Sequence, residues 1–412
     1  MNPEQLVEDL LRRLAPQVLA VLARREPNFD LCEDAVQEAL VEGAARWPVD
    51  GIPDHPRGWL VTVAANRLID HQRSDGARRR REEQVAALEL RDPGRADDEE
   101  TRADDTLTLL FLCCHPALSP PSQLALALRA VGGLTTAQIA SAFLAPEATV
   151  AQRISRAKQR IRATGTHFTL PHPDERAARL RVVMHVLYLM FTEGHTATGG
   201  PALQRVDLAR EALRLTRLAH RLLPDEDELT GLLALMLLTH ARGPARNTAD
   251  EGLVVLADQD RGGWDAAAVA EGTALVEQAL AAGAVGEYQL QAAIAAVHAQ
   301  ATRAEDTDWP QIRTLYDVLH RLTPTPVVAL NRAVAIALTA GPAAGLGAVD
   351  AMSPDDLAAC GHRADAVRGH LDELAGNHHD AREQYLRAAA RATNDTERRY
   401  LEERAARLGP SP

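Results

Sequence analysis

The sequence is poor in cysteine and aromatic residues and has no long uncharged apolar run, and these shortages exclude several classes of protein. Four cysteines in 412 residues, none in a CxxC pair, argue against a disulfide framework and favour a reducing compartment. No segment reaches the ~20 uncharged residues that a bilayer span needs, and the first residues carry acids rather than a secretory leader. We therefore expect a cytoplasmic protein with no membrane partner.

The sequence also lacks the patterns that usually carry catalysis or hold a cofactor. It contains no Gly-rich phosphate loop, no nucleophile elbow and no H-E-x-x-H metal pattern. Cys113, Cys114 and His115 invite a metal interpretation, but vicinal cysteines rarely share one ion and the flanking residues are apolar, which favours buried packing. We predict no catalytic residue, no metal and no cofactor, and an enzyme within residues 170–412 has no support.

What the chain has is helical periodicity in a sequence that is 46% apolar. Apolar residues recur at spacings of three and four, as in Leu60, Val63, Ala64 and Leu68. Alternating β-branched runs are missing, and the Ala- and Leu-rich segments have a strong intrinsic preference for helix. The sequence predicts an all-α fold of two to four domains.

The net charge of −12 conceals large local differences. Residues 55–81 carry seven arginines against two acids, and residues 134–168 carry five basic residues against one acid. Residues 82–105, which lie between these segments, contain ten acids, and residues 169–412 hold 33 acids against 24 basic residues. Because phosphate binding needs only a local basic face, the two basic segments allow a nucleic-acid partner despite the acidic total.

Residues 135–165 have the pattern of a helix-turn-helix. Thr135 or Thr136 can cap a short helix that ends at Ala142, and Pro146 suits the first turn of a second helix. One face of the second helix is an apolar stripe of Val150, Ile154, Ala157 and Ile161. The opposite face carries Thr149, Gln152, Ser155, Arg156, Gln159 and Arg160. This layout favours DNA binding in the major groove over an ordinary solvated helix pair.

A second pattern lies nearer the N-terminus. Residues 31–46 read as an amphipathic helix with an acidic face, and residues 57–74 read as a helix with an aliphatic stripe. The polar side of the second helix carries Asn66, Arg67, Asp70 and Arg73. Trp47 and Trp59 are more often core residues than platforms for base stacking, and we expect them in the core.

Together these segments carry a family resemblance. DAVQEAL with GWLVTVAANRLIDHQR, followed by LSPPSQLALALRAVGGLTTAQIASAFLAPEATVAQRISRAKQRIR, resembles regions two and four of the extracytoplasmic-function sigma factors of bacterial RNA polymerase. The remaining residues resemble a tetratricopeptide-like extension found on one group of these factors. The resemblance implies region two over 1–81, an acidic linker over 82–105, region four over 106–166 and a helical regulatory domain over 167–412.

The resemblance also implies roles for residues of region two. Asp34, Gln37 and Glu38 stand where such factors contact the clamp helices of the largest subunit of core RNA polymerase. Asn66 stands where the family reads an unstacked base of the minus-ten promoter element. Arg67 and Arg73, with the arginines of 78–81, would hold the backbone of the opened strand.

In region four the resemblance implies contacts with the minus-thirty-five element of promoter DNA. The implied DNA-binding residues are Thr149, Ala151, Gln152, Arg153, Ser155 and Arg156. Ala151 departs from the family, which often has a basic or polar residue at that position. The acidic linker either follows the RNA path of the polymerase, where a negative chain can mimic RNA, or is a solvated spacer.

The C-terminal residues leave more alternatives open. Residues 365–393 fit one tetratricopeptide unit, which could offer a face to a protein partner, while a plain helical bundle fits as well. This domain either covers a basic module and inhibits it or braces regions two and four, and we favour bracing. The rival to a sigma factor is a stand-alone helix-turn-helix regulator with a helical sensor domain, which has no need of the residues around Asp34 and Asn66.

Overall fold

The structure is a computed structural model, in which the described residues form α-helices, short 3₁₀ helices, turns and loops. It describes residues 3–26, 28–75, 99–143, 145–165, 168–200, 203–247, 252–281, 283 and 285–409. Within these ranges the regular elements are all helices, and extended pairing is limited to two isolated β-bridges. The predicted all-α fold is confirmed. No helix in these ranges is long and apolar enough to cross a membrane.

The chain divides into two compact units, Met1–Leu189 and Met190–Pro412. The helices of the first unit are α1 (Pro3–Arg25), α2 (Phe29–Asp50), α3 (Pro56–Asp75), α5 (Glu99–Cys113), α6 (Pro120–Ala130), α7 (Thr136–Ala142), α8 (Glu147–Thr164) and the first part of α9 (Pro173–His195). The division between the two units falls within α9, after Leu189, whereas the domain boundary predicted from the sequence lies at residue 166. That boundary stays a prediction.

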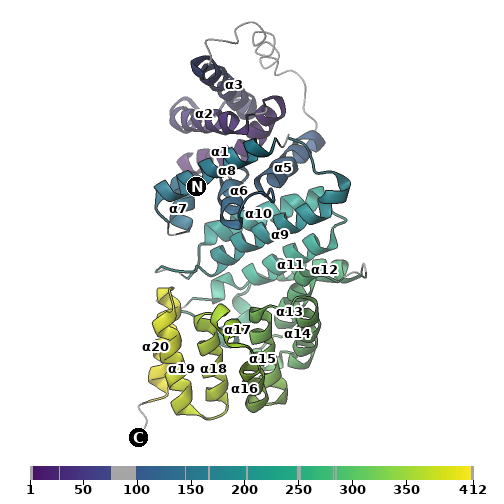
Figure 1. Cartoon of the computed structure of the whole chain (residues 1–412), viewed down its shortest axis with the longest axis vertical. Coiled ribbons are helices and arrows are strands. Elements are labelled where there is room, and N and C mark those ends of the chain that lie inside the picture. Colours follow the sequence, from purple (N-terminus) through teal and green to yellow (C-terminus); the bar gives the residue numbers. More distant parts are fainter. Residues whose placement is uncertain are drawn as a thin grey trace. The chain divides into compact units, whose positions relative to one another are not determined.

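The first three helices pack as a bundle in which α2 lies against both α1 and α3 (Figure 1). Their apolar stripes supply the core, and Leu22 of α1 and Leu60 of α3 are fully buried. Trp47 at the end of α2 is buried and meets Trp59 of α3 edge to face, with 5.5 Å between ring centroids. The prediction that the tryptophans fill the core is confirmed for Trp47, while Trp59 is only half-buried.

The predicted helix-turn-helix is confirmed as α7 and α8. Thr135 caps α7 by accepting a hydrogen bond from the Gln138 backbone N–H at 3.1 Å, and the Gln138 side chain accepts one from the Thr135 N–H at 2.8 Å. This reciprocal capping box fixes where the short helix begins. Pro146 is the N-cap of α8, one position earlier than expected, and Gly165 ends α8 in the left-handed region at φ 66°.

The prediction of an extended acidic linker over 82–105 is wrong at its C-terminal end. α5 begins at Glu99, so residues 99–105 are helical. Asp105 is buried on this helix and forms an ion pair with Arg24 of α1. The sequence prediction assumed that the carboxylates of this segment repel one another and keep it extended. The ion pair with Arg24 weakens that repulsion at Asp105, so a helix can form there. Residues 82–98 lie outside the described part of the chain.

The second unit is an array of helices that pack against their neighbours in sequence. After the end of α9 come α10 (Val206–Leu222), α11 (Asp227–His240), α12 (Ala266–Ala281), α13 (Glu287–Gln300), α14 (Trp309–Leu322), α15 (Pro326–Ala340), α16 (Pro342–Asp350), α17 (Pro354–Ala359), α18 (His362–Leu374), α19 (His378–Arg391) and α20 (Asp395–Arg407). The short 3₁₀ helices η1 (Gly243–Ala245), η2 (Leu256–Asp258) and η3 (Arg261–Gly263) join α11 to α12, and η4 (Ala304–Asp306) precedes α14.

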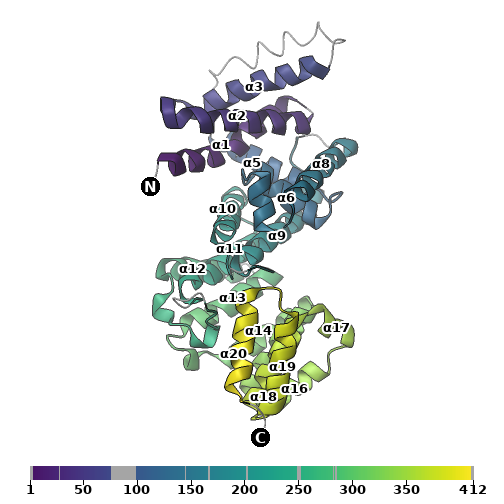
Figure 2. The same ribbon diagram turned by 90° about the vertical axis from the view of Figure 1, so that its left-hand side faces the viewer.

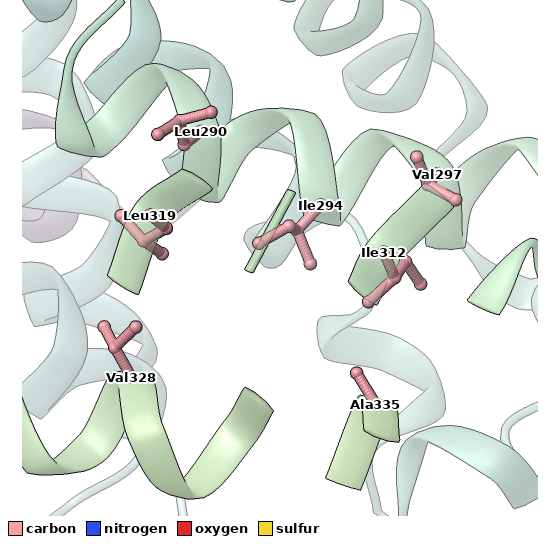
Figure 3. Close-up of a cluster of buried hydrophobic side chains, with 7 residues drawn as sticks. All are labelled: Leu290, Ile294, Val297, Ile312, Leu319, Val328 and Ala335. Carbon is pink, nitrogen blue, oxygen red and sulfur yellow. The ribbon is translucent and has the colours of Figure 1, made fainter. Parts of the chain in front are cut away.

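Small residues and one apolar cluster hold the middle of this array. Gly231 of α11 lies against α13, and a Cβ there would come within 2.7 Å of the Gln289 backbone nitrogen. The helices α13, α14 and α15 share a core cluster (Figure 3) made of Leu290, Ile294, Val297, Ile312, Leu319, Val328 and Ala335. This cluster holds α13, including its last turn, against α14 and α15.

The predicted tetratricopeptide unit corresponds to one helical hairpin, α18 and α19, with α20 lying beside α19 (Figure 2). Gly369 permits the close approach of the two hairpin helices, since a Cβ there would lie 3.1 Å from Tyr385. The Tyr385 hydroxyl donates to Glu373 at 2.7 Å, and Arg404 of α20 pairs with the same carboxylate. The hairpin is therefore tied to the terminal helix by both packing and charge.

Candidate functional site

The outer face of α8 carries the predicted region-four residues. The apolar stripe expected from the sequence is buried, since Val150, Ile154, Ala157 and Ile161 are each at most 5% exposed. The exposed residues are Thr149, Ala151, Gln152, Ser155 and Arg156, and Arg153 is half-buried. The side chains of Gln152, Arg153 and Arg156 form no hydrogen bond or ion pair with another described residue. Amide and guanidinium donors are therefore available to base edges and phosphates.

The residues predicted to bind the opened strand of promoter DNA lie on α3. Asn66 is exposed, and its amide forms no hydrogen bond with any other residue that the structure describes. Arg67 is exposed too, but its Nη2 donates to Glu42 of α2 at 2.9 Å and its Nε lies 3.6 Å from Glu38. Arg73 belongs to α3, although its side chain and residues 78–81 lie outside the described part of the chain.

The predicted polymerase-binding residues lie on α2, and their charges are already partly balanced. Asp34 and Glu38 are exposed and Gln37 is half-buried. Glu38 Oε1 lies 2.8 Å from His71 Nε2, and Asp34 Oδ1 accepts from Lys158 Nζ at 3.1 Å. The acidic face expected from the sequence is therefore present, but it has intramolecular partners.

Lys158 makes a set of buried contacts that the sequence analysis missed. It lies on α8 and is buried, and its ammonium contacts three carboxylates of α2: Asp30 at 2.6 Å, Glu33 at 3.1 Å and Asp34 at 3.1 Å. Burial lowers the pKa of the ammonium, but the three carboxylates outweigh this effect and raise the pKa above its usual value. Lys158 is the lone lysine among 45 basic residues, and that rarity was the available signal.

The geometry of this cluster explains the choice of lysine. An ammonium is a compact charge with three donors that can each point to a different carboxylate. A guanidinium is a planar fork that suits one carboxylate at a time. Three acids around one position on α2 therefore fit lysine better than the arginine that the rest of the chain uses.

Glu33 lies at the centre of the contact between α2 and the helix-turn-helix. Its side chain is 2% exposed, and it accepts a second charged hydrogen bond from Arg129 Nε of α6 at 2.7 Å. Gly133, at φ 67°, allows the loop after α6 to approach α1, because a Cβ there would lie 3.0 Å from the Arg12 carbonyl oxygen. Removing one partner from such a buried pair costs roughly 3–5 kcal/mol.

The vicinal cysteines are part of the core. Cys113 and Cys114 are fully buried, and burial raises the pKa of each thiol above its usual value. The prediction of buried packing is therefore confirmed. No group of three metal-ligating side chains occurs in the described part of the chain.

Comparison with protein families identifies both halves of the first unit. Residues 10–78 match the family described as Sigma-70 region 2, and residues 108–161 match Sigma-70, region 4. The chain belongs to the sigma-70 family. It is an RNA polymerase sigma factor, so it binds core RNA polymerase and promoter DNA to start transcription, and the helix-turn-helix of this sigma factor is its region four.

Two relatives support this assignment. The chain is 31% identical over 137 residues to the "Probable ECF RNA polymerase sigma factor SigI" of Mycobacterium tuberculosis, which covers 32% of this chain and 47% of SigI. It is 43% identical over 407 residues to the "Uncharacterized protein R00370" of Rhizobium meliloti, covering 96% of this chain and 94% of that protein. No solved structure matches the chain.

The helical extension of this sigma factor has a family match but no known role. Residues 179–280 match a family of unknown function, DUF6596, which begins within α9 and ends within α12. A C-terminal extension was expected from the sequence, and this match fits it. What the extension does is not stated by the family description.

Proposed function

We propose that this sigma factor contacts the clamp helices of core polymerase through Asp34, Gln37 and Glu38, and reads promoter DNA through α3 and α8. The observation that carries the proposal is the contrast between the two sets of side chains. The DNA-reading groups, Asn66 and Arg156, have no intramolecular partner among the described residues. The acids of α2 are solvent-accessible but paired with basic residues of the same chain, as they would be with basic residues of the polymerase.

The contact between α2 and α8 bears on when the sigma factor can work. Elements about 25 base pairs apart, as their names state, are separated by about 85 Å at ~3.4 Å per base pair of B-DNA. Lys158 of α8 lies 3.1 Å from Asp34 of α2, and α2 packs against α3. The two DNA-reading helices, α3 and α8, are therefore much closer together than the two promoter elements. We propose that this is the closed form of the free protein and that α8 leaves α2 when the polymerase and both promoter elements are bound.

In this proposal the polymerase competes with Lys158 for Asp34. Asp34 is 53% exposed, so basic residues of a partner can reach its carboxylate. Glu33 is buried and cannot be reached, so its bonds to Lys158 and Arg129 give the closed form its stability. Opening exchanges one set of ion pairs for another, so its net free-energy cost is smaller than that of breaking the pairs outright.

The test is core binding by the Lys158→Met variant, with Arg160→Met as the matched control. Arg160 is an exposed cation on the same helix without an ion-pair partner among the described residues, so both changes remove one positive charge from α8. We expect Lys158→Met to raise the affinity for core polymerase by up to about tenfold, or ~1.4 kcal/mol, and Arg160→Met to leave it unchanged. Fluorescence anisotropy of the labelled full-length chain measures the affinity.

Two further variants make the result decisive. In an Asp34→Ala background the gain from Lys158→Met should shrink, because the carboxylate that it frees for the polymerase is gone and only the loss of the Lys158–Glu33 pair still favours opening. A double change of Lys158→Met with Glu33→Gln removes the buried carboxylate charge and keeps the first unit folded if the single change does not. An affinity gain that is undiminished without Asp34, or no gain in a folded variant, contradicts the competition.

We also propose that the second unit regulates the first in cis. This unit makes up most of residues 169–412, a range that holds 33 acids against 24 basic residues, and an acidic excess disfavours contact with promoter phosphates and favours protein surfaces. The terminal hairpin α18 and α19 with α20 offers helical faces of the kind that bind a peptide or protein partner.

A further inference from the structure

Basic side chains gather at one place in the second unit, where the loop after α11 meets the ends of α9 and α13. The cluster consists of His195, Arg242, Arg246, Arg261 and His298. Arg242 lies within electrostatic reach of all the others: it interacts with Arg246 and Arg261, and with both histidines. Three guanidinium charges thus share a partly buried region.

Two of the arginines are held in place by neutral acceptors. Arg246 donates to the His195 carbonyl oxygen and to Thr196 Oγ1, the latter at 2.9 Å. Arg261 donates to the carbonyl oxygens of His298 at 2.6 Å and Ala301 at 2.8 Å. These bonds orient the guanidinium groups but leave their charges uncompensated.

Arg242 has no partner at all among the described residues. Its Nε is buried without an acceptor, and its side chain forms no ion pair. Burial and repulsion from Arg261 lower the pKa of Arg242 to about 10, so it remains charged at neutral pH. The Arg242 side chain as a whole is half-buried, and a partly desolvated charge that lies near two other cations without a counter-ion is unfavourable.

The nearby carboxylates do not neutralise the cluster. Asp306 attracts the charge of Arg261 electrostatically, and Glu397 attracts that of Arg246. Asp306 is already paired with Arg303 at 3.3 Å, and Glu397 lies 3.2 Å from His362. Neither forms a hydrogen bond with an arginine of the cluster in the described part of the chain.

Three unsatisfied groups at the cluster can only donate, and His298 Nδ1, which is also unsatisfied, can donate when it carries the ring proton. These donors define the chemistry of the missing partner. Arg242 Nε, Arg261 Nε and Trp264 Nε1 are all buried without an acceptor. These nitrogens can only donate. Trp264 belongs to the same place, because Arg261 lies over its ring at 5.4 Å from the centroid.

We propose that this cluster is a binding site for a phosphate group, either free phosphate or the phosphate of a small ester. A tetrahedral oxyanion offers several acceptor oxygens to donors that converge from different directions, and arginine forks are suited to it. The site lies on α9, the α11–α12 loop and α13, and the cluster in Figure 3 fixes α13. The proposal is independent of the polymerase and promoter contacts proposed above and assigns a ligand to the extension.

The histidines of the cluster fit this ligand. Burial, together with Arg242 and Arg261, lowers the pKa of His298 to about 4, and burial with Arg246 and Arg242 holds the pKa of His195 well below its usual range. Both rings are therefore neutral in the free protein and add no repulsion to the arginines. Their Nδ1 or Nε2 protons remain available as further donors.

The test compares the full-length chain with Arg242→Met and with Arg321→Met as a control. Arg321 is an exposed arginine at the end of α14 without an ion-pair partner in the described residues. Thermal unfolding and isothermal titration calorimetry are followed in low-salt, phosphate-free buffer to which inorganic phosphate, glycerol 3-phosphate or acetate is added. Inorganic phosphate and the ester distinguish the two forms of the ligand, and acetate tests whether any anion suffices.

We expect saturable phosphate binding and a raised melting temperature in the wild type and in Arg321→Met. Arg242→Met should lose the phosphate response by at least tenfold in affinity, and in phosphate-free buffer it should melt higher than the wild type because the repulsion among three neighbouring guanidinium charges is reduced. Trp264→Phe removes one donor with little change in shape and should weaken binding severalfold. An equal response to acetate, an undiminished response in Arg242→Met, or no response in the wild type overturns the proposal.

Discussion

Lys158 is a buried cation and Arg242 a half-buried one, and only Lys158 has carboxylate partners. Lys158 contacts three acids of α2, so its charge stabilises the arrangement of the first unit. Arg242 lies near other cations, so its charge is unfavourable in the free protein, and the proposed phosphate would relieve this repulsion. The same physical term therefore gives a structural role to one residue and a binding role to the other.

His298 provides a pH-dependent measure of this second environment. Its folded-state pKa of about 4 lies below the usual value near 6.5, so between these values the unfolded chain binds more protons and stability falls as the pH falls. We expect the second unit to lose about 2 kcal/mol between pH 7.5 and pH 5 from this residue. Urea unfolding of the full chain at several pH values measures the loss.

A pair of variants assigns that loss to His298. His298→Gln should remove about 2 kcal/mol from the pH dependence, with the remainder due to His195 and other histidines of lowered pKa, whereas a change at the exposed His378, on α19, should leave it intact. If His298→Gln retains the full slope, the titrating group is another one.

At the scale of the element, α8 combines a buried contact and an exposed reading face on one helix. Its apolar stripe holds it in the helix-turn-helix, Lys158 holds it against α2, and Arg156 stays exposed on another side. Contact with α2 therefore leaves the DNA-reading face uncovered. The closed form of the first unit limits how far α8 can be from α3, and it leaves the DNA-binding chemistry of α8 unchanged.

Arg156→Ala tests the reading face. If Arg156 binds a guanine in bidentate fashion, its loss costs ~1–3 kcal/mol and relaxes discrimination at one position of the upstream promoter element. Binding to a set of promoters with single-base changes measures this. A uniform loss over all sequences would instead assign Arg156 to phosphate contact.

Thr135→Ala tests the capping box of α7. The change removes the acceptor for the Gln138 N–H and should destabilise the first unit by ~1 kcal/mol. Thermal unfolding reports the change, and Thr149→Ala on the exposed face of α8 serves as the control. Equal stabilities of the two variants would show that the capping box is not needed.

At the scale of the whole molecule, α9 connects the sigma module to its extension. Arg179 in the first part of α9 donates to the Phe111 carbonyl oxygen of α5 at 2.7 Å, and Leu180 and Val183 are buried. The extension therefore begins with a helix that belongs partly to the first unit, which is consistent with the preference for bracing over a free tether.

Two truncations separate this bracing from regulation. A chain of residues 1–168 lacks α9 and should aggregate, because Leu180 and Val183 are buried and their removal uncovers the apolar surface around them, whereas 1–189 retains the first unit and should be monomeric. Size-exclusion chromatography and run-off transcription with core polymerase compare both with the full chain. A monomeric, fully active 1–168 chain would show that α9 is dispensable.

The sequence by itself determined the elements and the kind of protein. The three-and-four spacing, the cap at Thr135, the helix start signalled by Pro146 and the segment charges are local properties, and they led to the all-α fold, the helix-turn-helix and the sigma-factor resemblance. The DNA-reading residues were identifiable for the same reason: side chains opposite an apolar stripe on a helix must face solvent. Their exposure on α8 follows from that periodicity.

Only the tertiary structure decided which charges meet. Lys158 and Glu33 are separated by 125 positions, and Arg242 and His298 come from different helical segments, so no local pattern links them. The sequence showed that Asp34 is acidic but not that it forms an ion pair with Lys158. It also showed arginines in the extension, but not that three of them lie together without a paired carboxylate. Electrostatic energy depends on distance and burial, and both are fixed only when the helices pack.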